Sequence, residues 1–208
     1  MAESAIAERN DFIELLKYGH LQLERPLSVA EFVSLYRKFP DLRMEREKNG
    51  KVTIMTPVKR GSGKRESILN GYLWQWASER GKGEVYSPST GIQLSSGAIK
   101  SPDCAWVSDE RLAQQPEDKE EAFLKVVPDF VAEIRSDSDG LVRLKRKMAD
   151  SWMANGVRLS WLIDPYQEKV WIYRPEQEVE VISGFADKTL SGEDILPGLE
   201  LPLEPFIP

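Results

Sequence analysis

The strand, helix and strand predicted between residues 126 and 164 constrain the fold more than any other feature. Residues 126–136, VVPDFVAEIRS, predict a strand, because apolar residues lie between a proline and a polar Ser-Asp-Ser-Asp-Gly loop. A helical pattern follows from about Leu141 to Ala154, and residues 158–164, RLSWLID, predict the next strand. Strands joined by such a helix are typical of a parallel crossover, so part of the sheet is predicted to be parallel or mixed.

Other elements are predicted around this unit. Residues 28–39 predict a helix in which Ser28 is the N-cap and Glu31 completes a capping box. Asn49-Gly50 lies between two strand-like runs and predicts a tight hairpin. The remaining predictions are a helix at 7–19, strands near 83–87, 91–95, 98–101, 103–108 and 169–175, a long packed helix at 65–80 after a basic loop, and a C-terminal loop with a final edge segment at 189–208.

Size and composition indicate one domain and limit its chemistry. The 208 residues suit a single domain over residues 1–208, with residues 1–27 as an N-terminal helical extension. The net charge of −6 argues against coating nucleic acid through bulk charge, although it leaves local binding open. A single cysteine, Cys104, excludes an internal disulfide, and a single histidine, His20, excludes a zinc site with several histidines. Because the sequence has neither a signal-like start nor an apolar run of about 18 residues, we expect a cytoplasmic protein without a membrane segment.

Asp103 and Glu133 are the candidates for a shared metal site. An aspartate at the start of one strand and a glutamate on the neighbouring strand can bring their oxygens close together, and Mg²⁺ and Mn²⁺ prefer oxygen ligands. Asp129 is a poorer partner, because four residues along a strand span roughly 13 Å. The alternative is that Asp103 merely opens a strand and Glu133 is a buried acid paired with Arg135, which shares its face of the strand.

Glu66 and two basic clusters extend the set of candidates. Glu66 falls on the same helical sector as Leu69 and Leu73, so its carboxylate is predicted to point inward, unless it serves only the helix dipole. The basic clusters are either phosphate contacts or solvated surface charge. They are VKRGSGKR, with Lys59, Arg60, Lys64 and Arg65, and VRLKRKM, with Lys145 and Lys147.

Cysteine and tryptophan residues are predicted to be structural. Cys104 is expected to be a small buried thiol, because nothing near it in the sequence suggests a thiolate nucleophile. Most of the six tryptophans lie in apolar periodic runs and are expected in the core, although a tryptophan can also stack on a base.

Seven segments in a fixed order resemble the bacterial Uma-two family of endonucleases, formerly a domain of unknown function and assigned to the PD-(D/E)XK nuclease superfamily. The resemblance covers about residues 28–201. It implies an α/β (α+β) fold with a restriction-endonuclease-like core, in which a central mixed β-sheet is flanked by helices, with N-terminal helices and a β-hairpin. The segments are EREKNGKVTIMTP, GKRESILNGYLWQW, STGIQLSSGAIKSPDCAWVS, VVPDFVAEIRSDSD, NGVRLSWLIDP, VWIYRP and LSGEDILPGLEL.

The resemblance also implies roles for individual residues. Asp103 matches the family's Pro-Asp aspartate, Glu133 the acid of its Glu-x-x element, and Glu66 a first-helix glutamate. With the backbone carbonyl of Ile134, these acids are implied to hold Mg²⁺ (or Mn²⁺), Glu66 either directly or through water. The superfamily's lysine, two residues after the acid, is Arg135 here, and a guanidinium can stabilise a phosphate but cannot act as a base.

The lysine role is implied to move to the helix that follows the strand. Ungapped alignment from Glu133 reaches Lys147, which is therefore the first candidate. A helical wheel places Lys145 nearer the buried stripe, so Lys145 is kept in reserve. The resemblance implies that this lysine lies four positions before a helix aromatic, but Lys147 precedes Trp152 by five positions. The lysine would orient or deprotonate the attacking water, and Arg135 would stabilise the transition state.

Together these residues imply a metal-dependent endonuclease that hydrolyses DNA phosphodiester bonds. The alternative is a catalytically inactive nuclease-fold module that binds DNA or a protein partner, because a fold does not fix a function. A homodimer would suit cleavage of both strands, although the sequence leaves the oligomeric state open. The residues expected to contact nucleic acid are Lys59, Arg60, Lys64, Arg65 and Lys145.

Overall fold

The computed structural model describes residues 21–116 and 123–208 and divides the chain into two compact units. Unit 1 comprises Met1–Val58 with Ser95–Lys100, and unit 2 comprises Lys59–Leu94 with Ser101–Pro208. The helix predicted at residues 7–19 lies outside the described residues, as does His20. The expectation of one domain over residues 1–208 stays a prediction.

In unit 1, the described residues form a helix and a small antiparallel sheet. Helix α2 (Val29–Lys38) begins with the predicted capping box, because Oγ of Ser28 accepts from the Glu31 N–H at 3.2 Å and the Ser28 N–H donates to Glu31 at 2.8 Å. Gly50, with a φ of 85°, lies in the predicted hairpin. Helix and hairpin are confirmed, whereas Leu21–Gln22, expected within a helical extension, is a strand. The strands are β1 (Leu21–Gln22), β3 (Val52–Ile54), β2 (Met44–Arg46) and β6 (Ile99–Lys100), in this spatial order.

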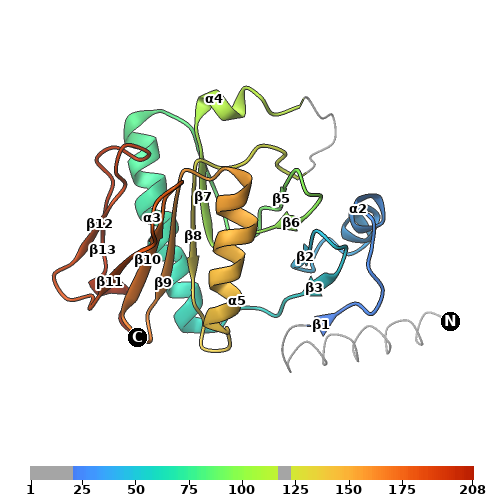
Figure 1. Cartoon of the computed structure of the whole chain (residues 1–208), viewed down its shortest axis with the longest axis horizontal. Helices are drawn as coiled ribbons and strands as arrows, with labels where there is room; N and C mark the ends of the chain where they lie inside the picture. Colours follow the sequence, from blue (N-terminus) through green and yellow to red (C-terminus); the bar gives the residue numbers. More distant parts are fainter. Residues whose placement is uncertain (1–20, 117–122) are drawn as a thin grey trace. The chain divides into compact units, whose positions relative to one another are not determined.

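Unit 2 is built on a six-stranded mixed sheet with the strand order β11-β10-β9-β8-β7-β4 (Figure 1). β8 (Phe130–Ile134) and β9 (Leu159–Asp164) run parallel, and the other neighbours are antiparallel. The predicted crossover is therefore confirmed. Unit 2 also contains β4 (Glu84–Tyr86), β5 (Ile92–Gln93), β7 (Cys104–Val107), the short helix α4 (Asp109–Leu112), β10 (Lys169–Tyr173) and β11 (Glu180–Ser183).

Helix α3 (Arg60–Arg80) is the long packed helix predicted at 65–80, but it begins five residues earlier. The segment expected as a basic loop forms its first turns. Ser62 and Arg65 are both buried, so these turns have a packed face that offsets the low helix propensity of the glycines beside them. Further along, Leu69 and Leu73 pack into the same core cluster as Ala132 and Ile134 of β8.

The crossover helix changes its hydrogen-bonding type along its length. It starts as α5 (Leu141–Arg146), continues as a π-helix, η2 (Lys147–Trp152), and ends as a 3₁₀ turn, η3 (Met153–Asn155). Gly156 closes it with a φ of 94°, as the sequence predicted. Because side chains alternate along a strand and the neighbours of Glu133 face α3, Glu133 points to the opposite face of the sheet, where η2 lies.

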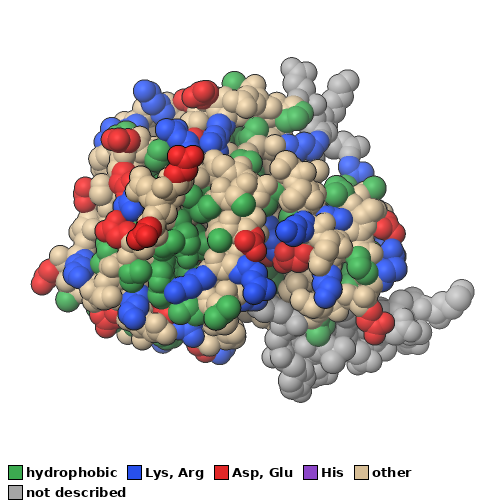
Figure 2. All heavy atoms as spheres, in the orientation of Figure 1, with side chains coloured by type: hydrophobic (Ala, Val, Ile, Leu, Met, Phe, Trp, Pro, Cys, Tyr) green, Lys and Arg blue, Asp and Glu red, His purple; other side chains and the backbone are tan. Residues whose placement is uncertain are grey.

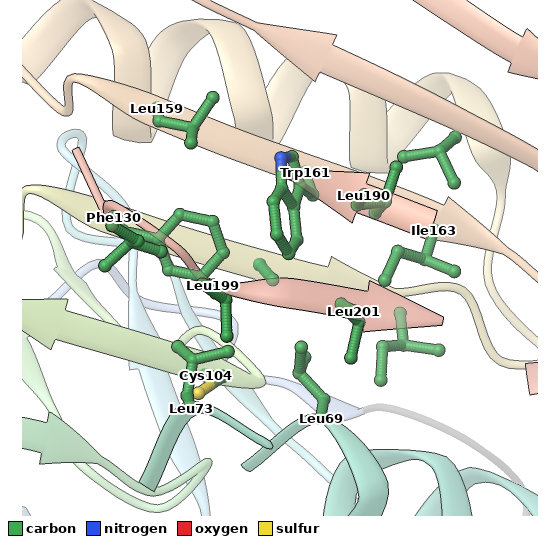
Figure 3. Packing of buried hydrophobic residues seen from close by; sticks show 14 of the residues in the cluster. Leu69, Leu73, Cys104, Phe130, Leu159, Trp161, Ile163, Leu190, Leu199 and Leu201 are labelled. Carbon is green, nitrogen blue, oxygen red and sulfur yellow. The ribbon is translucent and has the colours of Figure 1, made fainter. Parts of the chain in front are cut away.

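The C-terminal residues form regular structure, whereas the sequence predicted a loop with a final edge segment. They form the two-stranded sheet of β12 (Thr189–Ser191) and β13 (Glu200–Pro202), followed by the 3₁₀ turn η4 (Glu204–Phe206). Figure 3 shows Leu190, Leu199 and Leu201 among the side chains of the main core, together with Trp161. The tail is therefore part of the core of unit 2. Leu199, Leu201 and Leu203 alternate as in a strand, but the glycines and prolines around them are loop signals, which is why the sequence did not indicate burial.

Candidate functional site

Asp103 and Glu133 lie opposite each other on neighbouring strands. β7 and β8 are antiparallel with Cys104 opposite Ala132, and continuing this register by one residue pairs Asp103 with Glu133. Oδ2 of Asp103 accepts a hydrogen bond from the Ile134 N–H at 2.7 Å, and Glu133 is only 3% exposed. The structure thus brings the two acids together as the sequence predicted. That they share a metal ion stays a prediction.

The buried Glu133 carboxylate receives two donors from the π-helix. Nζ of Lys147 lies 2.8 Å from Oε1 of Glu133, and the indole N–H of Trp152 donates to the same oxygen at 2.9 Å. Glu133 is therefore paired with Lys147, whereas the alternative interpretation had paired it with Arg135. Of the two lysine candidates, Lys147 contacts the site, whereas Nζ of Lys145 lies 4.2 Å from the ring centroid of Trp171.

Two further groups tie the site together, and sequence reasoning missed both. The Asn70 side chain donates to the backbone carbonyls of Glu66 and Asp103, at 2.8 and 2.9 Å, and so links α3 to the start of β7. Nζ of Lys147 also donates to the Ser101 carbonyl at 3.0 Å. Asn70 follows Glu66 by one helical turn, and this spacing was the signal that could have identified it. The Ser101 carbonyl carries no sequence signal.

The donor set suits a hard divalent ion in its chemistry, because Asp103, Glu133 and the carbonyl of Ile134 all offer oxygen. Within the two described stretches of chain, however, no group of three or more His, Cys, Asp or Glu side chains could hold a metal ion. Glu66 is half-buried on α3, whose apolar side packs against the sheet face opposite Glu133. A contact of Glu66 with a metal ion, either direct or through water, stays a prediction.

Arg135 is engaged at the end of β8. Its guanidinium donates to Oδ2 of the fully buried Asp164 at 2.9 Å and to the carbonyl of Asp139 at 3.1 Å. It also lies 5.8 Å from the ring centroid of Tyr166. These contacts join the ends of two parallel strands, so Arg135 has a structural role whether or not it contacts a phosphate.

The loop after β8 is held by its own acids and serines. Asp139 accepts from the N–H and Oγ of Ser136, at 3.1 and 2.7 Å, and pairs with Arg143 one turn into α5. Burial raises the pKa of Asp139, but these hydrogen bonds and the arginine outweigh it, and the pKa lies below the usual 3.8. This ordered loop connects the Glu133 strand to the helix that carries Lys147.

The basic cluster at 59–65 is divided between surface and core. Lys59 pairs with Asp137 at 2.6 Å, and this hydrogen bond raises the pKa of Lys59 and lowers that of Asp137. Arg60 and Lys64 are exposed on the first turns of α3. Arg65, expected at the nucleic-acid surface, is instead 5% exposed and donates to the carbonyl of Phe206 at 2.9 Å. Basic and acidic side chains are interspersed on the face that Figure 2 shows.

Other sequence candidates are structural, as expected. Cys104 is fully buried, and burial, followed by the nearby charge of Asp103, raises the pKa of its thiol far above the ordinary value. Asp129 is buried at the other end of β8, where it pairs with Arg111 at 3.2 Å and Arg158 at 3.3 Å. Trp74, 66% exposed on α3, is the exception to five buried tryptophans at positions 76, 106, 152, 161 and 171.

Comparisons with known proteins agree with this fold. A family model described as "Uma2: Putative restriction endonuclease" matches residues 29–204. Among solved structures, the chain is similar to a protein from Anabaena variabilis whose title reads "a putative nuclease belonging to DUF820", with 19% identity and a TM-score of 0.71 over 87% of this chain and 97% of that chain. At this identity the likeness concerns the fold, and it supports the expected α/β architecture with a central mixed sheet. The comparison with curated proteins found no match.

None of the helices in residues 21–116 and 123–208 has the length and apolarity to cross a membrane.

Proposed function

Because the chain belongs to the Uma2 family, we propose that it is a divalent-metal-dependent endonuclease that hydrolyses phosphodiester bonds of DNA. One observation carries the proposal: Asp103 and Glu133 face each other on neighbouring strands while Lys147 reaches the same carboxylate from the crossover helix. Two acids that offer oxygen ligands to a divalent ion, with a lysine beside them, can support metal-assisted hydrolysis of a phosphodiester bond.

Asp103, Glu133 and the backbone carbonyl of Ile134 would hold Mg²⁺ or Mn²⁺, with Glu66 contributing through water. When bound, the ion would acidify a water molecule and offset charge on the scissile phosphate. The N–H of Ile134 fixes Oδ2 of Asp103, and Asn70 fixes the backbone of the same residue. These bonds pre-organise the aspartate before any ligand arrives.

Lys147, whose Nζ lies 2.8 Å from Oε1 of Glu133, would orient the attacking water, or would deprotonate it when a bound cation favours the neutral amine. Arg135 would offset charge on the phosphate in the transition state, while its bond to Asp164 holds it at the end of the strand.

Lys59, Arg60 and Lys64 would contact the DNA backbone, with Lys145 as a further contact. The buried Arg65 would serve them by anchoring the first turns of α3. We further propose that the protein acts in the cytoplasm, as a homodimer when both strands are cut.

The proposal is tested by calorimetric titration of Mn²⁺ and Mg²⁺, with nicking of supercoiled plasmid measured on the same preparations. Wild type should bind and nick, and Asp103→Asn and Glu133→Gln should lose both while still unfolding in a single cooperative thermal transition. Asp129→Asn is the matched control, because it alters a buried acid next to β8 that lies away from the site. Retained nicking in Asp103→Asn, or equal losses in the control, would reject the assignment.

The second candidate is a nuclease-fold module that binds DNA or a protein partner without cleavage. It is favoured by the two donors on Oε1 of Glu133, since Lys147 and Trp152 already compensate this buried charge. In that case wild type binds no metal, and substitutions at Lys59, Arg60 and Lys64 still weaken DNA binding.

A further inference from the structure

The π-helical turn of the crossover helix places two residues on one oxygen atom. Lys147 and Trp152 are five residues apart, and in an α-helix with 3.6 residues per turn they would point about 140° apart. In a π-helix the hydrogen bonds run from i to i+5, so these two positions come to the same face. The π-helix spans Lys147–Trp152, and both side chains meet Oε1 of Glu133.

Trp152 is more than a space-filling residue in this arrangement. Its side chain is fully buried, and its N–H finds a charged acceptor. Trp161 of β9 offers a comparison within the same protein, because it is equally buried but its indole nitrogen has no hydrogen-bond partner among the described residues. A buried indole in this fold thus does not require a partner, and the bond of Trp152 is specific to Glu133.

We propose that Trp152 is a positioning residue that fixes the Glu133 carboxylate for metal binding, and that the π-helical turn exists to bring it there together with Lys147. The metal part of this inference rests on the proposed function. The hydrogen bond from the N–H of Trp152 holds Oε1 of Glu133 in place and so restricts rotation of this carboxylate. Partners of this kind orient a ligand, and their loss typically weakens metal binding by about 10- to 100-fold.

The first test concerns the hydrogen bond in the metal-free protein. In ¹⁵N-labelled wild type, the assigned indole N–H resonance of Trp152 should lie downfield of that of Trp161 and should move on Glu133→Gln, while the Trp161 resonance stays. If the Trp152 resonance moves no more than that of Trp161, the inference is wrong. This measurement needs no substitution of a tryptophan, so it does not depend on the folding of such a variant.

The second test uses Trp152→Phe and Trp161→Phe, which remove similar volumes from two buried sites. Calorimetric titration of Mn²⁺ should show binding weakened at least about tenfold in Trp152→Phe and within about twofold of wild type in Trp161→Phe. Equal affinities in the two variants would overturn the positioning role. A wild type that binds no Mn²⁺ would overturn the proposed function and with it the metal part of the inference, and the indole resonance would then decide whether Trp152 fixes the carboxylate.

Discussion

Nζ of Lys147 lies 2.8 Å from Oε1 of Glu133, across the space between the crossover helix and the face of β8. Lys147 is 14% exposed in its side chain and Glu133 is buried, so the pair is shielded from most of the solvent. Breaking a charge pair in such a setting costs more than breaking a surface pair, because the remaining charge is left buried and uncompensated.

Lys147→Met should therefore lower both stability and activity. We expect a loss of about 2 kcal/mol in the free energy of unfolding, because a hydrogen bond to a charged group is removed, and loss of plasmid nicking under the proposed function. Lys145→Met is the control for stability, and loss of its contact with Trp171 should cost less than about 1 kcal/mol. Urea denaturation measures the stability and the nicking assay the activity. Equal losses of stability in the two variants would contradict the assignment of Lys147.

Arg135→Ala should destabilise the protein even without substrate. The change leaves the fully buried Asp164 without its guanidinium partner, and we expect a loss of about 3 kcal/mol in the free energy of unfolding. Arg143→Ala removes a more exposed arginine and should cost about 0.5 kcal/mol. An Arg135 variant as stable as the Arg143 variant would show that the Asp164 pair is not structural.

Stability in acid should depend on Asp139. Its folded-state pKa lies below the unfolded value of 3.8, so its stabilising contribution is present above that pH and is lost as the pH falls through the folded-state pKa. The difference in unfolding free energy between wild type and Asp139→Asn should stay constant above about pH 5 and shrink below pH 3.8. Chemical denaturation at several pH values checks this. A difference that persists unchanged to about pH 3 would contradict the lowered pKa.

Phe206→Ala should be among the most damaging changes outside the sheet. Phe206 is fully buried in the core cluster, and we expect a loss of about 3–4 kcal/mol in the free energy of unfolding. Its neighbour Ile207 is 37% exposed, and Ile207→Ala should cost less than about 1 kcal/mol. Similar melting temperatures for the two variants would mean that the tail does not pack as described.

Cys104 should resist thiol reagents in the native protein. Burial and the charge of Asp103 raise the pKa of its thiol, so little reactive thiolate forms near neutral pH. Labelling by a chromogenic disulfide should be slow until urea unfolds the chain. Rapid stoichiometric labelling of the folded protein would show that the start of β7 opens easily.

Local signals predicted the elements that local physics determines. The capping box at Ser28, the hairpin at Gly50 and the strand around Glu133 were all indicated by residues near one another in sequence. The meeting of Asp103 and Glu133 was also accessible, because it needed only two adjacent strands and their alternation. The resemblance to the nuclease family added the order of these parts.

What the sequence could not predict depends on long-range contacts. The tail was predicted as a loop because prolines and glycines surround its alternating leucines, and only the assembled core shows that these leucines pack with α3 and the sheet. Arg65 was interpreted as surface charge, because its hydrogen-bond acceptor, the carbonyl of Phe206, lies 141 positions away in the sequence. A regular helical wheel favoured Lys145 over Lys147, and the π-helical turn does not follow that wheel.

The extra residue in that turn affects how relatives of this chain should be compared. Lys147 and Trp152 keep a common target although Trp152 follows Lys147 by five positions. A chain in which the aromatic residue follows the lysine by four positions can present the same two groups from a regular α-helix. An alignment should accordingly place a single-residue gap within positions 148–151 and leave the lysine in register. A search pattern with one fixed lysine-to-aromatic distance would divide relatives that share the same chemistry.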